Sequence, residues 1–170
     1  DVLCLQETKQ NNDNFPHDVF EKQGLFSSHN GQNTYNGVAI ISNKELNNVQ
    51  FDIPNFYDVQ KRLISGIYHN DQDSRFRVIS AYIPNGQSIN SDKFEYKMNW
   101  LKSFISSLQQ KIDGVENIIT GDFNIAPTTL DCYDSKSWDG KILVSPQERQ
   151  YFDKLLNLGF IDTFREMNPN

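Results

Sequence analysis

The chain has 170 residues, of which 37% are hydrophobic and 22% are charged, and this composition excludes a disordered or collagen-like protein. A chain of this length buries roughly 70% of its unfolded surface, so we expect a single domain over residues 1–170, and no apolar run approaches the roughly 20 residues that span a bilayer. The net charge of −6 argues against binding nucleic acid through overall charge, but it suits a carboxylate-rich metal site and leaves room for a local basic patch.

The first half of the chain is predicted to form mainly strands. Residues 2–5 are a continuous apolar run that contains Cys4, which is typical of a strand covered on both faces, and a short helix is expected within residues 15–23. Residues 37–42 form a second buried strand. Residues 63–68 and 76–83 alternate in part and are separated by a polar segment, which predicts a β-hairpin.

The second half of the chain adds two helices and a strand. Apolar residues recur every three or four positions between residues 92 and 112, which predicts an amphipathic helix capped by Ser91 or Asp92. Residues 117–120 form the next strand. A last helix begins at Pro146, with Phe152, Leu155 and Leu156 facing inward. Because strands outnumber helices and are joined both by hairpins and by helices, the pattern predicts a mixed, layered α/β domain.

Two acidic residues follow predicted strands, Glu7 near the start of the chain and Asp122 after residues 117–120. Strand ends are where open α/β sheets present their sites. An alternation with a period of two would place Asp122 and Asn124 on one face, and Gly121 leaves space for another chain or a ligand beside the backbone. Such oxygen ligands suit magnesium, whose remaining ligands are waters and substrate phosphates. The alternative is that each acid is an ordinary turn residue.

The motifs Leu5-Gln-Glu-Thr-Lys9 and Gly121-Asp-Phe-Asn-Ile-Ala-Pro127 are accompanied, in order along the chain, by residues 35–39, Arg62, and residues 81–86, 94–97, 146–149 and 159–164. Together these segments resemble the exonuclease III family of apurinic/apyrimidinic endonucleases, within the endonuclease/exonuclease/phosphatase superfamily. The resemblance implies a two-sheet α/β sandwich flanked by helices, as in DNase I. It also implies a metal-dependent DNA phosphodiesterase of base-excision repair, acting as an abasic-site endonuclease, a 3′→5′ exodeoxyribonuclease or a 3′-phosphatase.

The resemblance assigns roles to individual residues. Glu7 is similar to the family's metal-binding glutamate, with Mg²⁺ as the expected metal and Mn²⁺ as an alternative. Asp122 resembles the aspartate that orients or deprotonates the attacking water, Asn124 the asparagine that helps hold the phosphate, and Tyr82 the tyrosine that contacts the scissile phosphate. The DNA-facing positions would be Arg62, Lys97, Asn33, Tyr35 and Asn36.

Some of these residues have simpler readings. Tyr82 could be an ordinary strand aromatic. Lys97, only approximately opposite Phe94 and Leu101 on its helix, could be a solvated lysine. The three histidines match no catalytic position of the family and are expected at the surface; they are His17, His29 and His69.

The family pattern extends beyond both ends of this sequence. It begins with a strand that carries a metal-site asparagine and closes with a Ser-Asp-His motif, and neither occurs in these residues. We therefore expect an incomplete sandwich that is inactive or barely active alone, because losing a member of a catalytic unit costs on the order of a thousandfold. The expected partner is double-stranded DNA with an abasic or 3′-blocked site.

The protein is expected to act as a monomer and without a membrane. A cytoplasmic location is expected because two cysteines cannot form a disulfide framework and suit a reducing compartment. Two other functions stay open. One is a phosphatase or phosphodiesterase of the same superfamily that acts on a lipid or inositol phosphate. The other is a non-catalytic DNA-binding remnant.

Overall fold

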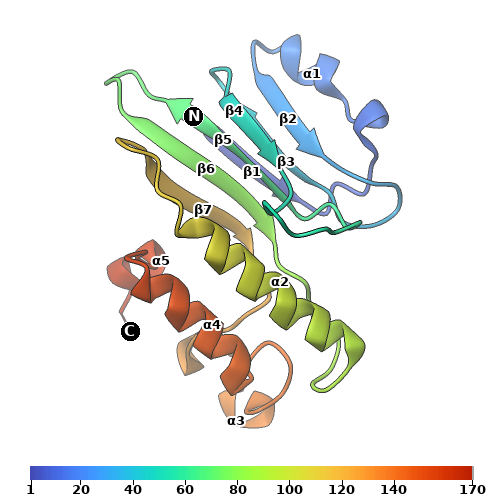
Figure 1. The fold of residues 1–170 in the computed structure, drawn as a ribbon, viewed down its shortest axis with the longest axis vertical. Helices are drawn as coiled ribbons and strands as arrows, with labels where there is room; N and C mark the ends of the chain where they lie inside the picture. The colour runs from blue at the N-terminus through green and yellow to red at the C-terminus, as the bar shows by residue number, and fades with distance from the viewer. Residues whose placement is uncertain (170) are drawn as a thin grey trace. The chain divides into compact units, whose positions relative to one another are not determined.

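A computed structural model describes residues 1–169, which form two compact units (Figure 1). The first unit comprises residues 1–83 and 111–123 and contains every β-strand that the structure describes. The second unit comprises residues 84–110 and the chain from residue 124 onward, and its regular structure is helical. No helix within residues 1–169 is long and apolar enough to cross a membrane.

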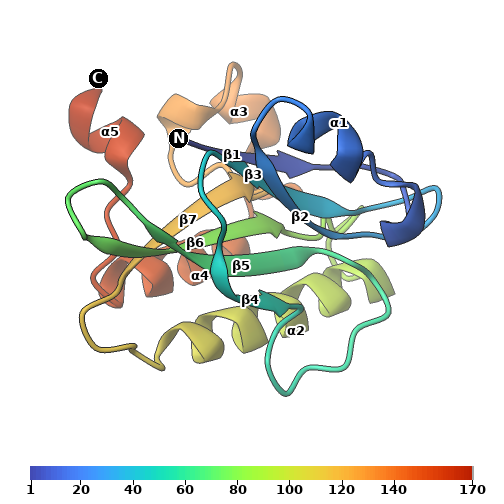
Figure 2. The same ribbon diagram turned by 90° about the horizontal axis from the view of Figure 1, so that it is seen from above.

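The strands of the first unit form two sheets (Figure 2). The three-stranded sheet has the order β1-β3-β2, with β1 Val2–Gln6, β2 Phe26–Asn30 and β3 Val38–Ser42, all antiparallel. The four-stranded sheet has the order β4-β5-β6-β7, with β4 Asn47–Phe51, β5 Leu63–His69, β6 Arg75–Tyr82 and β7 Glu116–Asp122. Its β6–β7 pair is parallel and its other pairs are antiparallel. The two sheets, one antiparallel and one mixed, and the β5–β6 hairpin confirm the predicted fold class.

The core of the first unit is built on β3, which is buried along its whole length. Alternate residues serve opposite faces of this strand, because successive side chains of a strand point to opposite sides. One face contributes to a cluster with the second sheet, formed by Val38, Ile40, Leu46, Ile64, Tyr68 and Val78. The other face packs with the segment around α1 (His17–Glu21), where Phe15, Ala39 and Ile41 form a second cluster. A short 3₁₀ turn, Asn12–Asn14, precedes α1.

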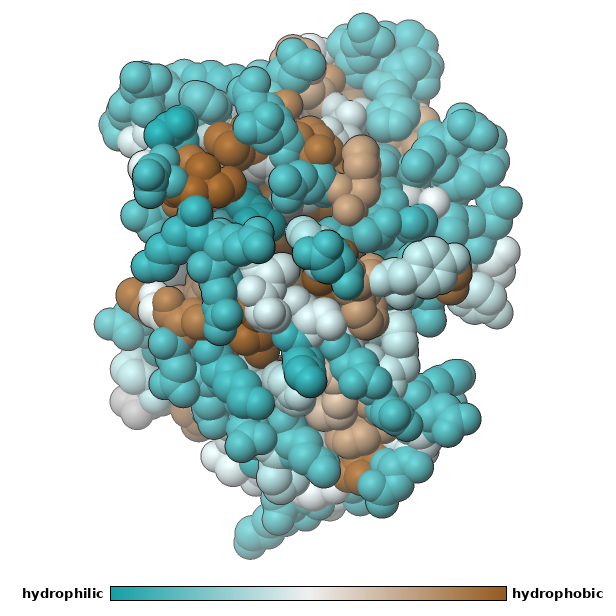
Figure 3. All heavy atoms as spheres, viewed as in Figure 1, coloured by the Kyte–Doolittle hydropathy of each residue, from teal (hydrophilic) through white to brown (hydrophobic). Residues whose placement is uncertain are grey.

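The first strand is less covered than its apolar sequence suggests. β1 is an edge strand that pairs only with β3 among the described strands, and Leu3 is 55% exposed, so the expectation that both faces are covered is wrong. A pocket of about 500 Å³ lies beside β1, β6 and β7, and its lining includes Cys4, Phe76 and Ile118. Hydrophobic side chains, drawn in brown, gather over the strands in Figure 3. Partial burial raises the pKa of the Cys4 thiol, which is not in a disulfide.

The second unit contains α2 (Asp92–Leu108), α3 (Ser135–Trp138), α4 (Pro146–Asn157) and α5 (Thr163–Met167), with a 3₁₀ turn at Thr129–Asp131. The start of α2 is as predicted, since the Ser91 hydroxyl accepts a hydrogen bond from the Phe94 amide. The helix ends at Leu108, before the predicted end at Ile112.

The last long helix, α4, begins at Pro146 as predicted and packs against α2. Ser145 and Glu148 form a capping box, in which each side chain accepts a hydrogen bond from the other residue's backbone amide. Leu155 is buried as expected. Leu156 is exposed, so the inward-facing stripe is narrower than predicted.

Candidate active site

Two predicted site residues end neighbouring strands of the second sheet. The parallel register of β6 and β7 places Tyr82 beside Asp122, and the Ile83 amide donates to the Asp122 carbonyl oxygen at 2.9 Å. Gly121 permits this approach, because it has a φ of +140° and a Cβ there would lie 1.9 Å from the Ala81 carbonyl oxygen. The space predicted beside Gly121 is thus filled by the neighbouring strand.

The end of β1 is held against β6 close to this pair. The side-chain amide of Gln6 donates to the hydroxyl of Ser80 at 3.1 Å, and Ser80 comes two residues before Tyr82 on β6. Glu7 follows directly, in the left-handed backbone region with a φ of +53°. Its carboxylate lies 3.1 Å from the Lys9 ammonium, and both side chains are about half exposed. Because such exposed ion pairs contribute little free energy, the Glu7 carboxylate stays available to a metal or a ligand.

Tyr82 lies in the electric field of both carboxylates. Burial raises the pKa of Tyr82 above its ordinary value, and the negative charges of Glu7 and Asp122 raise it further, while Arg62 opposes the shift. The Arg62 guanidinium lies 4.6 Å from the centre of the Tyr82 ring and donates to the Tyr82 carbonyl oxygen at 3.2 Å. The phenol therefore keeps its proton near neutral pH and can donate it in a hydrogen bond to a phosphoryl oxygen.

Arg62 is tied in turn to the loop that was predicted to face DNA. The Gln60 side-chain oxygen accepts hydrogen bonds from Arg62 Nε at 2.9 Å and Nη2 at 2.8 Å, and from Asn36 Nδ2 at 3.4 Å. Asn36 is buried, whereas Asn33 and Tyr35 are exposed. The loop thus presents Asn33 and Tyr35 outward and uses Asn36 internally. Gln60, which connects the two parts, was not predicted from the sequence.

The second unit holds Asn124 in a separate polar cluster. The Asn85 side-chain amide donates to the Asn124 side-chain oxygen at 3.1 Å. The Lys97 ammonium donates to the backbone carbonyl oxygens of Asn124 at 2.6 Å and Asn85 at 3.2 Å. It also forms an ion pair with Glu148, whose carboxylate oxygen lies 2.5 Å away. The lysine therefore fixes the backbone at both asparagines.

Lys97 differs from both sequence-based readings, because a DNA-facing cation and a solvated lysine each need an accessible ammonium. The Lys97 and Glu148 side chains are 0% exposed. Lys97 comes three residues after Phe94 and four before Leu101, which places it on the buried face of α2. Glu148 also accepts hydrogen bonds from the Leu143 and Ser145 amides and the Ser145 hydroxyl, so the buried carboxylate is well satisfied.

The backbone after Asp122 departs from the predicted alternation. β7 ends at Asp122, and Asn124 has a φ of +48°, outside the extended region. The residue that sequence reasoning missed is Asn85, the hydrogen-bond partner of Asn124. A signal was present, since Asn85 belongs to the segment of residues 81–86 that carries the family resemblance.

The histidines divide between surface and core. His17 is exposed and forms a hydrogen bond with Ser27, as expected of a surface residue. His29 is buried, which corrects the prediction: its ring stacks on Phe15 at 4.0 Å, and Nε2 lies 2.8 Å from the Thr8 hydroxyl. Burial, helped by the charge of His17, lowers the pKa of His29 from 6.5 to about 4. It is therefore a neutral core residue near pH 7.

The donor set for a metal is small. Residues 1–169 contain no group of three or more His, Cys, Asp or Glu side chains that could hold a metal ion. A closed zinc site needs four such ligands. Magnesium binds through one or two carboxylates and completes its shell with water and phosphate, so the carboxylates of Glu7 and Asp122 suit it.

The sequence and the fold are both similar to those of known proteins. Residues 1–169 match the model of the Endonuclease/Exonuclease/phosphatase family. Exodeoxyribonuclease III of Haemophilus influenzae is 32% identical over 185 residues, which cover 99% of this chain and 66% of that protein.

Two solved structures share the fold over the whole chain. A 3′ phosphatase from Neisseria, bound to a product DNA hairpin, superposes with a TM-score of 0.93 and 37% identity, covering 100% of this chain and 65% of that one. An AP endonuclease from Archaeoglobus fulgidus gives a TM-score of 0.90 and 32% identity, with the same coverage. The chain thus spans about two thirds of the length of these relatives.

Proposed function

Because this chain belongs to the endonuclease/exonuclease/phosphatase family, and its likeness to exonuclease III and AP endonucleases is confirmed, we propose that the protein carrying it is a metal-dependent DNA phosphodiesterase. Its substrates are double-stranded DNA with an abasic site or a blocked 3′ end, processed by a monomer in base-excision repair in the cytoplasm. The observation that carries the proposal is the meeting of Glu7, Tyr82 and Asp122 at the ends of β1, β6 and β7.

The chemistry divides among the side chains of this cluster. The Asp122 carboxylate orients the attacking water and accepts its proton. The Tyr82 hydroxyl donates to a phosphoryl oxygen without adding a full charge, and Arg62 supports its ring from one face. Glu7 would hold the metal, Mg²⁺ or alternatively Mn²⁺. When bound, the metal supplies positive charge to the phosphoryl and leaving oxygens.

Two further groups of residues, the asparagine amides of the second unit and the loop of the first, are proposed to contact phosphate and DNA. The Asn85 and Asn124 side chains offer N–H donors to phosphate oxygens, and Lys97 keeps both in place through their backbone carbonyls. Asn33 and Tyr35 are the exposed loop residues that would contact the DNA backbone. Asn36 acts through its bonds to Gln32 and Gln60, which hold the loop.

The test is strand cleavage by the whole protein that carries this chain. One duplex oligonucleotide contains a single tetrahydrofuran abasic analogue and a second ends in a 3′-phosphate, each assayed with Mg²⁺ and with EDTA. We expect Mg²⁺-dependent cleavage that falls on the order of a thousandfold in Asp122→Asn. Asp153→Asn, the same change at an exposed position on α4, should leave the rate unaltered.

Two outcomes would overturn the proposal: no cleavage of either substrate with Mg²⁺, or equal cleavage by Asp122→Asn and the wild type. Release of phosphate from an inositol phosphate with neither DNA cleaved would favour a different substrate. DNA binding without turnover would favour a non-catalytic role.

The 170 residues alone are expected to be inactive or barely active, about a thousandfold or more below the whole protein, for lack of the motifs that the family carries elsewhere. Comparing the two on the abasic duplex measures this directly. Equal rates would show that the residues named here suffice.

A further inference from the structure

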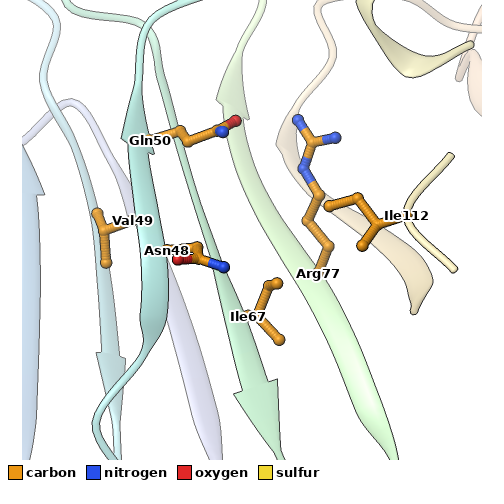
Figure 4. A pocket seen from close by; sticks show the side chains of 6 residues that line it. All are labelled: Asn48, Val49, Gln50, Ile67, Arg77 and Ile112. Carbon is orange, nitrogen blue, oxygen red and sulfur yellow. The ribbon is translucent and has the colours of Figure 1, made fainter. Parts of the chain in front are cut away.

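The first unit contains a second pocket, on β4, β5 and β6. Its volume is about 270 Å³, and the side chains that line it are those of Asn48, Val49, Gln50, Ile67, Arg77 and Ile112 (Figure 4). Arg77 comes five residues before Tyr82 on β6, which corresponds to about 17 Å along an extended strand. The pocket is therefore distinct from the strand ends that form the proposed active site.

Arg77 is the unusual member of this pocket. Arg77 is only 8% exposed, yet its guanidinium forms no hydrogen bond or ion pair within residues 1–169. Its neighbours across the sheet, Ile67 on β5 and Asn117 on β7, carry no charge. Burial alone lowers the pKa of Arg77. Buried charges in proteins are nearly always paired, whereas the Arg77 guanidinium lines the pocket without a partner of opposite charge among the described residues.

A backbone irregularity places two further donors at the same pocket. The β4–β5 register shifts between Asn47 and Gln50, and Asn48 has a φ of +49°. Such bulges redirect side chains and occur often beside functional sites. The amides of Asn48 and Gln50 form no hydrogen bond within the described part of the chain. In Figure 4 the polar ends of Gln50 and Arg77 extend to the same end of the pocket.

We propose that this pocket binds a phosphate group carried by a small organic molecule, such as a nucleoside monophosphate. The guanidinium offers a fork of two N–H donors to two phosphate oxygens, and the Asn48 and Gln50 amides offer one donor each to the others. A phosphate monoester presents three terminal oxygens in a tetrahedral arrangement, whereas a carboxylate presents two oxygens in one plane.

The remaining walls suit the organic part of the ligand, because Ile67 and Ile112 are apolar. A volume of about 270 Å³ is near the lower limit of small-molecule pockets, roughly 300 Å³, and exceeds what a bare phosphate ion needs. Such a site does not depend on the proposed hydrolytic function, since none of its residues belongs to the active-site cluster.

The experiment is titration calorimetry of the protein with inorganic phosphate, deoxyadenosine monophosphate, deoxyadenosine and succinate. EDTA is present throughout, to prevent metal-dependent phosphate binding at Glu7. We expect saturable binding of both phosphate compounds in the millimolar range or tighter, with the nucleotide favoured, and no binding of deoxyadenosine or succinate. Binding of succinate as tight as that of phosphate would overturn the assignment.

Substitutions locate the binding. Arg77→Met should weaken nucleotide binding about tenfold or more, since the charge-assisted bonds are its main source of affinity. Its melting temperature without ligand should be unchanged or raised, because an unpaired buried charge is removed. The matched control, Arg75→Met, removes the same charge from an exposed position on the same strand and should bind as the wild type does.

A third variant covers the case in which Arg77→Met does not fold. Gln50→Glu places a carboxylate in the pocket, which should compete with the ligand for Arg77, abolish phosphate binding and raise the melting temperature. The proposal is overturned if the wild type binds neither phosphate compound at millimolar concentrations. It is equally overturned if the nucleotide binds undiminished to every folded variant altered at Arg77 or Gln50.

Discussion

Replacing Lys97 by methionine should destabilise the protein more than any surface substitution, because it leaves a carboxylate buried without its counter-charge. Methionine fills much of the volume of the lysine stem, so the change removes mainly the ammonium. The Glu148 carboxylate would keep its hydrogen bonds from Ser145 and Leu143 and lose its ion pair with Lys97. The backbone carbonyls of Asn85 and Asn124 would each lose a donor.

The magnitude follows from the 0% exposure of both side chains. Removing one partner of a buried ion pair costs about 3–5 kcal/mol, of which the unpaired charge is the largest part. Two lost hydrogen bonds to carbonyl oxygens add about 1 kcal/mol each where water does not replace the donor. The expected loss is therefore at least about 3 kcal/mol, a large part of the 5–15 kcal/mol that typically stabilises a domain.

Urea unfolding, followed by circular dichroism, measures this loss. The double variant Lys97→Met/Glu148→Gln should recover much of it, because its interior then contains no unpaired charge. Lys102→Met, at an exposed position of the same helix, should change the free energy of unfolding by no more than about 0.5 kcal/mol. The reasoning is refuted if Lys97→Met costs less than about 1 kcal/mol, or if the double variant is no more stable than the single one.

Three further changes test other parts of the structure. Gly121→Ala should destabilise the fold by about 2 kcal/mol or more in urea unfolding, because its Cβ would meet the Ala81 carbonyl oxygen at 1.9 Å in a backbone region that alanine avoids; an unaltered midpoint would contradict the β6–β7 packing. The pKa of His29 is about 4 in the fold and about 6.5 when unfolded, so only the unfolded state gains a proton as pH falls between these values. The free energy of unfolding should therefore decline by about 3 kcal/mol from pH 6.5 to 4. The free energy of unfolding should depend less steeply on pH in His29→Gln, and an equal dependence in the variant and the wild type would rule out His29 as its origin. Under the proposed function, Tyr82→Phe should lower the kcat of the whole protein on the abasic duplex about a hundredfold with little change in melting temperature, because only the proposed hydroxyl hydrogen bond to the substrate is lost; full activity would exclude Tyr82 from the reaction.

The parts of the fold that were predictable from the sequence are those with strong local signals. The apolar run of β3, the alternation of β5 and β6, the cap at Ser91 and the helix start at Pro146 depend on neighbouring residues alone. Two strands were missed, β2 and β4. Their sequences are polar, and they become strands only by pairing with β3 and β5, which local propensity does not report.

The site shows the same limit. The family resemblance selected Tyr82 and Asp122, and the structure places them in one register. The role of Lys97 depended on Glu148, 51 residues later, although the spacing from Phe94 and Leu101 already favoured the buried face of the helix. Arg77 gave no sign of burial, because an arginine that alternates with apolar strand residues normally faces water.

The parallel pairing of β6 and β7 has a consequence for the order in which the protein folds. β5 and β6 are joined by a short turn and can pair early, whereas β7 must wait for the intervening residues 83–115, a closure that costs about 3 kcal/mol in chain entropy. The phenol of Tyr82 and the carboxylate of Asp122 therefore meet only at a late step. We expect a nascent or partly unfolded copy to keep these two groups apart, so that the proposed active-site cluster forms only in a chain that has finished folding.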